Sequence, residues 1–196
     1  MVNKVLFNDL FNVNIIGGQI TSRIEAKDIS EKFETMKVLV PKAISNGGVK
    51  HEELGTLDVK LGVDSKRITK AGDIVMKLST PYDACLITKE DEGLLVPSFC
   101  AIINNLPENI DTEYLLAFIN SQPCKLQIKN IVSGSLTAIL STGQIKKIAI
   151  PVPSFDEQQE IANRYTQFIK KIQLLEKIVK LENEYLDSRF FEMEAK

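Results

Sequence analysis

The chain has 196 residues, which suits one domain with an appendage or two small domains. Its apolar fraction of 44% and charged fraction of 26% are ordinary for a soluble globular protein, and no apolar run is long enough to cross a bilayer. The N-terminus lacks a signal-peptide core, so we expect a cytoplasmic protein. The net charge of −2 does not mark the whole chain as a nucleic-acid-binding protein.

Cysteine and histidine are scarce. Cys85, Cys100 and Cys124 are widely spaced and form no CxxC pair, and His51 is the single histidine. This pattern predicts reduced, mostly buried thiols and excludes the usual zinc sites. We therefore expect neither a metal nor a cofactor.

Short β-type runs separated by turn residues occupy the first hundred residues. After a short apolar segment at 5–11, the sequence predicts strands at 14–18, 38–40, 74–76, 84–88 and 94–103, and either a surface helix or a loop at 24–34. Asn46-Gly47 within 45–49 predicts a tight hairpin turn, because these residues tolerate positive φ. Turns at this frequency predict a curled antiparallel sheet or barrel.

The pattern becomes helical after Asn109. Asp111 is a suitable N-cap for a first short helix, and Pro123 suits the first position of a second. Gly134 is the expected C-cap of that second helix, and a hydroxyl-rich loop follows at 133–144.

The last part of the chain predicts one long helix. Pro151 and Pro153 hold the entering chain extended, and Ser154 with Glu157 forms a capping box. Neither Gly nor Pro occurs after that point, so about 37 residues of helix would be about 55 Å long. The predicted fold class is therefore α+β, with a β-rich domain over 1–150, which also carries the short helices, and a long coiled-coil-type helix over 151–196.

Apolar residues line this helix at alternating spacings of four and three, which is typical of a coiled-coil seam. We predict a dimerisation seam made of Ile161, Tyr165, Phe168, Ile172, Leu175, Val179 and Leu186. A second apolar line contains Leu174, Ile178, Leu181 and Tyr185. The alternative is a helix that packs along its own domain, although a domain of about 150 residues offers little surface to cover it.

Charge is unevenly distributed. Between Glu113 and Asp156 there is no acidic residue, whereas this stretch carries Lys125, Lys129, Lys146 and Lys147. The stretch 36–50 is also free of acids and carries three lysines. Such local positive patches suit contact with phosphates, but solvated surface lysines give the same pattern.

Catalytic motifs are weak. Residues 79–82 (Ser-Thr-Pro-Tyr) loosely resemble the amino-methyltransferase element, but one proline is missing and no Gly-rich cofactor loop accompanies them. A phosphate-binding GxxxxGK[ST] loop is absent. Asp58, Lys60 and Asp64 could suggest a nuclease cluster, and His51 a general base, but ordinary surface positions explain both. We predict that the chain is not an enzyme.

Three segments together resemble a known family. Residues 150–153 (Ile-Pro-Val-Pro), followed by Glu157-Gln158 and Ile161, are similar to the junction in DNA-specificity subunits of type I restriction–modification systems. Residues 114–116 and 68–74 agree with the same family. The resemblance spans nearly the whole chain but covers a single repeat.

Full members of that family contain two target-recognition domains, each followed by a long helix, and the two helices pair antiparallel as a spacer. The resemblance therefore implies half a specificity subunit that homodimerises through its helix and reads one half of a split, symmetric DNA site. The implied partners are double-stranded DNA, the methyltransferase (modification) subunit and, indirectly, the restriction subunit.

Residues for DNA contact are chosen as cations, hydroxyls and one aromatic on expected loops. The candidates are Lys42, Lys50, Lys66, Arg67, Lys77, Ser79, Thr80, Tyr82, Lys129, Ser133, Ser135 and Thr137. Each could instead be an ordinary surface residue, and Tyr82 could be a buried aromatic. The neutral charge also permits a second hypothesis, a protein–protein adaptor with the same fold that does not read DNA.

Overall fold

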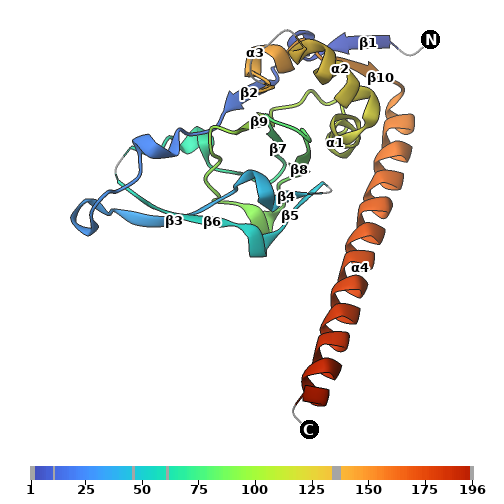
Figure 1. Ribbon diagram of the computed structural model, residues 1–196. Coiled ribbons are helices and arrows are strands. Elements are labelled where there is room, and N and C mark those ends of the chain that lie inside the picture. Colours follow the sequence, from blue (N-terminus) through green and yellow to red (C-terminus); the bar gives the residue numbers. More distant parts are fainter. Residues whose placement is uncertain (1–2, 11, 46, 61, 134–137, 195–196) are drawn as a thin grey trace.

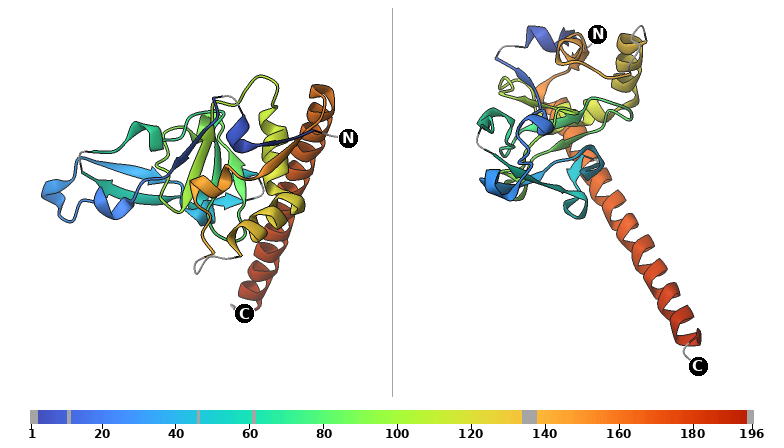
Figure 2. Two further views of the ribbon diagram at one scale, coloured as in Figure 1. Left: turned by 90° about the horizontal axis from the view of Figure 1, so that it is seen from above. Right: turned by 60° about the vertical axis from the view of Figure 1, so that its left-hand side comes forward.

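The computed structural model describes residues 3–10, 12–45, 47–60, 62–133 and 138–194. A β-rich head with short helices carries one long C-terminal helix, α4, which runs along one side of the head and continues far beyond it (Figures 1 and 2). This is the predicted α+β class.

The strands are β1 (Asn3–Leu6), β2 (Asn14–Gly17), β3 (Glu34–Val38), β4 (Ile44–Ser45), β5 (Gly48–Val49), β6 (Gly55–Val59), β7 (Ile74–Lys77), β8 (Ala84–Leu86), β9 (Cys100–Asn104) and β10 (Ala149–Val152). The helices are α1 (Thr112–Asn120), α2 (Gln122–Val132), α3 (Thr142–Ile145) and α4 (Phe155–Glu194). Single 3-10 turns connect several of the strands.

The centre of the head is a four-stranded antiparallel sheet in the order β2-β9-β7-β8. Successive side chains of a strand point to opposite faces, so β7 places Ile74 and Met76 in the core beneath α1 and α2 and Val75 in the core on the other face. Because both faces are covered, β7 and β9 are apolar without alternation. The predicted antiparallel sheet is confirmed.

The two ends of the head meet in a separate ribbon. β1 pairs antiparallel with β10, with Asn3 opposite Val152 and Lys4 opposite Pro151. The predicted domain boundary at 150/151 therefore falls inside a strand of the head. The cause is the pairing with β1, whose partner cannot be identified from local sequence.

Several local predictions need correction. The 38–40 strand ends at Val38, and the 94–103 strand is regular only from Cys100. Residues 24–34 form a loop with one 3-10 turn, and β3 begins at Glu34. The predicted hairpin is present as β4–β5, where Gly47 has φ +78°. The preceding residue, Asn46, is outside the described residues.

Side-chain caps define the short helices. The Asp111 carboxylate accepts a hydrogen bond from the Tyr114 amide at 2.8 Å, as predicted for α1. In α2, Ser121 is the N-cap and Pro123 occupies the second helical position instead of the first. The expected C-cap, Gly134, is outside the described residues.

The start of α4 has the predicted capping box. The Ser154 hydroxyl and amide donate to Glu157 Oε2 at 2.7 Å and 3.1 Å, and the Glu157 amide donates back to the hydroxyl at 3.4 Å. A sharply fixed first turn lets the helix leave the head in one direction.

The first turns of α4 are tied to α1 by polar contacts. Thr166 Oγ1 donates to Glu113 Oε2 at 2.9 Å, and Gln158 and Ala162 are buried in the contact. Beyond this contact the large apolar residues of the predicted seam are exposed, from 51% for Leu186 to 60% for Val179. The alternative of a helix covered along its whole length by its own domain is wrong.

The head covers only part of the predicted seam. Tyr165 and Ile172 are half-buried. The exposed members are Ile161, Phe168, Leu175, Val179 and Leu186. No helix in the described part of the chain is long and apolar enough to span a membrane.

Replacing Glu157 tests the capping box. Hydrogen bonds from the Ser154 hydroxyl and amide lower the pKa of the Glu157 carboxyl below its ordinary value. A lowered folded-state pKa gives stabilisation that is present above the unfolded-state value and is lost as the pH falls through the folded-state value. We expect Glu157→Ala to lower the thermal unfolding midpoint at neutral pH, and the difference from wild type to narrow as the pH falls and the carboxylate is protonated.

Asp156→Ala is the matched control. It removes a first-turn charge from the same helix end but no capping hydrogen bond, so its effect should be smaller. Equal effects of the two variants, measured by circular dichroism, would contradict the role of the cap.

Candidate nucleic-acid interface

Four exposed lysines lie on neighbouring elements of the head that are distant in sequence. The Gln127 side chain of α2 bonds the backbone of Ala149 at 2.9 and 3.0 Å, and Gln144 Nε2 donates to the Ile131 carbonyl at 3.4 Å. These contacts, with the β1–β10 pairing, join α2, α3, β1 and β10. We call the resulting set the α2–α3 basic surface: Lys4, Lys129, Lys146 and Lys147.

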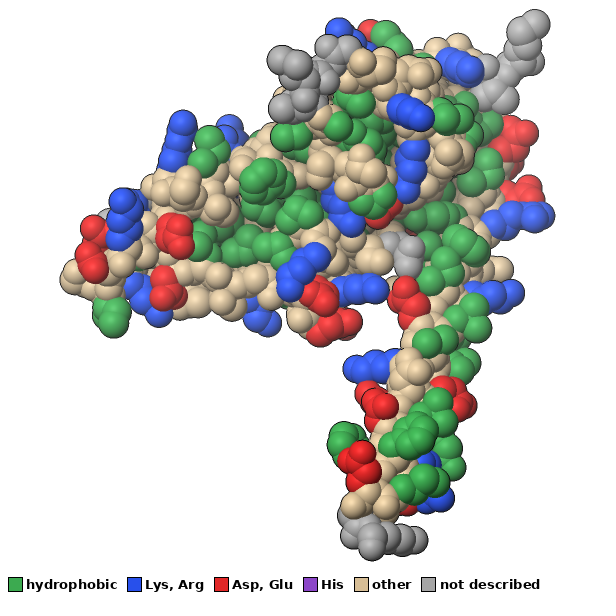
Figure 3. Space-filling model, in the orientation of Figure 1, with side chains coloured by type: hydrophobic (Ala, Val, Ile, Leu, Met, Phe, Trp, Pro, Cys, Tyr) green, Lys and Arg blue, Asp and Glu red, His purple; other side chains and the backbone are tan. Residues whose placement is uncertain are grey.

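The sign of this surface follows from the sequence. Neither α2, α3 nor β10 contributes an acid, because none occurs between Glu113 and Asp156. Asp9 is the nearby exception: the neighbouring Asn8 amide donates to the Lys146 carbonyl at 3.1 Å. Lysine and arginine side chains lie over the α2 end of the head in Figure 3. Such a surface attracts polyanions.

Two predicted DNA-contact residues, Lys42 and Lys50, flank the β4–β5 hairpin and form ion pairs there. Lys42 lies 2.7 Å from Glu53, whose pKa it lowers by hydrogen bonding and charge, and Lys50 lies 3.7 Å from Glu176 of α4. Each positive charge has an acid beside it, so this region offers little net attraction for phosphate. The second contact also links the β4–β5 hairpin to the long helix.

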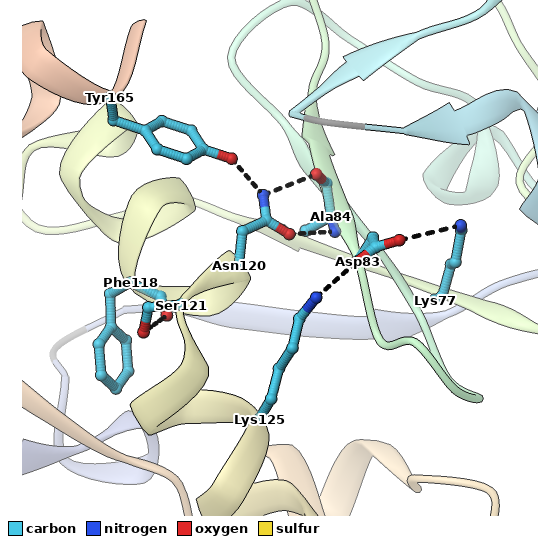
Figure 4. A network of polar contacts seen from close by, with 8 residues as sticks. All are labelled: Lys77, Asp83, Ala84, Phe118, Asn120, Ser121, Lys125 and Tyr165. Atoms are coloured by element: carbon cyan, nitrogen blue, oxygen red, sulfur yellow. Dashed lines mark hydrogen bonds and ion pairs between the residues drawn. The ribbon is translucent and has the colours of Figure 1, made fainter. Parts of the chain in front are cut away.

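Lys77 is held inside the head. Its ammonium lies 3.3 Å from Asp83, its side chain is only 12% exposed, and Lys125 binds the same carboxylate at 2.6 Å. Figure 4 shows the two lysines approaching Asp83 from β7 and α2. One carboxylate therefore binds both lysines and fastens α2 to the sheet.

Tyr82 belongs to the core. It is 7% exposed and its hydroxyl donates to the Ala138 carbonyl at 2.7 Å, so the buried-aromatic alternative describes it. A DNA contact through this side chain is not retained. Ser79 is half-buried and Thr80 is exposed in the same loop between β7 and β8.

Lys66 and Arg67 lie on a different part of the head. Arg67 donates from Nε to the Gly17 carbonyl at 3.1 Å and from Nη1 to Gln19 at 2.9 Å, so its guanidinium braces the end of β2. Lys66 is exposed. The predicted cations thus form separate groups and no single site.

Of the predicted DNA-contact residues, Lys129 belongs to the α2–α3 basic surface, and Ser133 follows at the end of the same helix. Both are exposed. Ser135 and Thr137 are outside the described residues. The predicted set omitted Lys146 and Lys147, although the acid-free stretch was a signal for them. Lys4 had no sequence signal, because only β1–β10 pairing brings it here.

Asn120 connects the head to α4. Its side-chain amide accepts from the Ala84 amide at 2.8 Å, donates to the Ala84 carbonyl at 3.0 Å, and donates to the Tyr165 hydroxyl at 2.8 Å (Figure 4). One side chain thus joins β8, the end of α1 and the long helix. A half-buried amide whose donors and acceptor are all paired in this way favours one arrangement of the three elements.

The thiols are buried, as predicted, and burial raises the pKa of Cys100 and Cys124 to about 12. Within the described residues, no group of three or more His, Cys, Asp or Glu is placed to hold a metal ion.

The fold and its surfaces define a two-part architecture, a β-rich head with a cationic surface and a long helix with an open apolar edge. Residues 9–183 match the family model of the type I restriction modification DNA specificity domain. That match covers most of the chain, including both parts, and the chain belongs to this family.

Solved structures share the fold. One is a chain described under complex assembly and conformational transition of the type I R-M system (TM-score 0.64), and another is the HsdS subunit from Thermoanaerobacter tengcongensis (TM-score 0.60). Each is 13% identical over 90% of this chain and 44% of its own length. The chain thus spans less than half the length of these relatives. A comparison with curated protein sequences gives no significant match.

Removing the Asn120 amide tests its connecting role. Asn120→Ala leaves the Ala84 backbone groups and the Tyr165 hydroxyl without this partner, and an unpaired buried polar group costs about 1–3 kcal/mol. We expect the free energy of unfolding to fall by about 2 kcal/mol or more in chemical denaturation. Asn130→Ala, on the exposed face of α2, is the control and should change it little.

Proposed function

We propose that the chain is a non-catalytic DNA sequence-recognition subunit of a type I restriction–modification enzyme. In this proposal the head, up to β10, reads one half of a split DNA site, and α4 sets the spacing and docks the methyltransferase subunit. The observation that carries the proposal is the family match over 9–183, which includes the head and most of the helix.

The α2–α3 basic surface supports DNA contact. Its lysines are exposed and come from segments that carry a single acid, so they can neutralise phosphates with little competition from internal ion pairs. Phosphate contacts position a protein on the duplex, whereas sequence is read by side chains at base edges. We therefore assign Lys4, Lys129, Lys146 and Lys147 to the backbone and leave base reading to neighbouring loops of the head.

The adaptor alternative also has specific support. The chain has a net charge of −2, and Lys42, Lys50 and Lys77 are paired with acids. An adaptor of this fold would bind its protein partners without salt-sensitive affinity for DNA. The two proposals therefore differ in one measurable property.

The open seam supports homodimerisation. Exposed apolar residues recur along α4 where the head no longer covers it, and burying them against a second helix removes their surface from water. We propose a two-fold dimer through α4, which would present two heads to a symmetric, interrupted target.

DNA binding should depend on the α2–α3 basic surface. We expect Lys129→Ala, Lys146→Ala and Lys147→Ala, combined, to weaken binding and to reduce the slope of log affinity against log salt by about 1 for each lost phosphate contact. The measurement is a filter-binding series on DNA with randomised sequence, with and without a methyltransferase partner. Lys42→Ala is the matched control, because its charge is already paired with Glu53.

Absence of salt-sensitive binding even with the methyltransferase present would favour the adaptor. Loss of binding in Lys42→Ala equal to that in the triple variant would instead place the DNA interface next to the β4–β5 hairpin.

Dimerisation should depend on the seam. Leu175→Asp puts a charge among exposed apolar residues, so we expect it to shift the chain to a monomer in light scattering without unfolding it. Ser188→Asp, exposed on the face of the same helix opposite the seam, should leave the dimer intact. A wild-type monomer at high concentration would contradict the dimer.

A further inference from the structure

The charge along α4 divides into two blocks of opposite sign. Residues 161–180 contain five Lys or Arg and one acid, whereas 181–194 contain five acids and one Arg. A parallel, in-register pair of such helices would place like charges together. An antiparallel pair places the acidic block of each helix beside the basic block of the other, so the helix is complementary to a copy of itself.

Exposure on the seam adds a constraint on register. The exposed large apolar residues of this line are Ile161, Phe168, Leu175, Val179, Leu186 and Met193. If the two-fold axis passes at Lys177, these six meet only one another: Leu175 faces the partner's Val179, Phe168 its Leu186 and Ile161 its Met193. Every one of them is then covered by an apolar neighbour.

In this register the charged partner residues fall opposite the two seam positions that the head already half-covers. Tyr165 and Ile172, already half-covered by the head, would face the charged Arg189 and Glu182. A slip of one heptad towards the C-terminus sets the exposed Val179 against Glu182. A slip the other way brings the acidic block opposite 153–166, which carries three acids and one Arg. The axis at Lys177 avoids both mismatches.

The head has a groove that can hold the end of the second helix. A groove of ≈ 470 Å³ lies between α1 and the start of α4, lined on the α1 side by Ala117 and Phe118 and on the α4 side by Ile161, Tyr165 and Phe168. In this register the partner's helix enters the groove with Leu186, Phe190 and Met193. Phe190 and Met193 are 64% and 62% exposed in the single chain, so an apolar groove can cover them.

We propose that the last turns of α4 from a second copy lie in the groove between α1 and α4, with the two-fold axis at Lys177. This inference rests on the proposed dimeric function and adds its register and its contact with the head. The contact of α4 with its own head centres near Ala162, so at 1.5 Å per residue the two heads would be held about 45 Å apart along the helices. That distance corresponds to about 13 base pairs.

Spin labels on Ser188→Cys measure the register. Ser188 is exposed and lies opposite the seam, whereas the native cysteines are fully buried, so labelling is directed to the new thiol. The register predicts an axial separation of about 33 Å between the two labels, and each one-heptad slip changes it by about 10 Å. Parallel in-register helices would instead place the labels level, separated by about 20 Å of helix width.

Two adjacent phenylalanines provide a matched pair for the groove. Phe190 lies on the seam side and Phe191 about 100° away, and both are exposed in the single chain, so neither substitution removes a core residue. We expect Phe190→Asp to raise the dimer dissociation constant at least about tenfold in analytical ultracentrifugation, and Phe191→Asp to change it little. Circular dichroism checks that both variants stay folded.

A label distance that fits another register or parallel helices overturns the proposal, as do equal effects of the two phenylalanine variants. Salt-dependent binding to DNA is measured separately on the same proteins. If binding persists while the distance is wrong, the register fails and the proposed function stands. If a dimer forms with the expected distance but DNA binding is absent, the DNA-reading function fails and the register stands.

Discussion

The contact between α1 and the first turns of α4 fixes the arrangement of the whole molecule. Its most buried polar residue is Gln158, 1% exposed, whose side-chain amide donates to the carbonyls of Asn109 and Pro153 and accepts from the Asp111 amide. A buried amide with all these bonds satisfied tolerates no change of angle, because any rotation would leave a polar group unpaired. The direction in which α4 leaves the head is thereby set.

That direction separates two tasks within one short chain. The head is stabilised by its own sheet, covered on both faces, and its core does not depend on the end of α4. The outer half of the helix has no such cover and gains stability by burying its apolar side against another helix. A chain with these properties suits a scaffold that positions a binding surface at a fixed distance.

Net charge conceals the electrostatic organisation of this protein. Some acids form ion pairs with specific lysines, as Asp83 does with Lys77 and Lys125, and five more lie in the last part of α4. Lys4, Lys129, Lys146 and Lys147 are exposed on β1, on α2 and just after α3. The net charge of the chain does not distinguish a lysine in an internal ion pair from a lysine that is available to a phosphate. Only the second contributes to long-range attraction.

The sequence by itself determined the elements whose signals are local. The capping box of Ser154 and Glu157, the Asp111 cap and the four-three spacing of α4 are interactions between neighbours along the chain, so their residues specify them directly. Only the tertiary structure decided the pairing of β1 with β10, the burial of Tyr82 and the assembly of Lys4 with Lys146. These depend on contacts between residues far apart in sequence, where many partners satisfy the same local pattern and packing selects one.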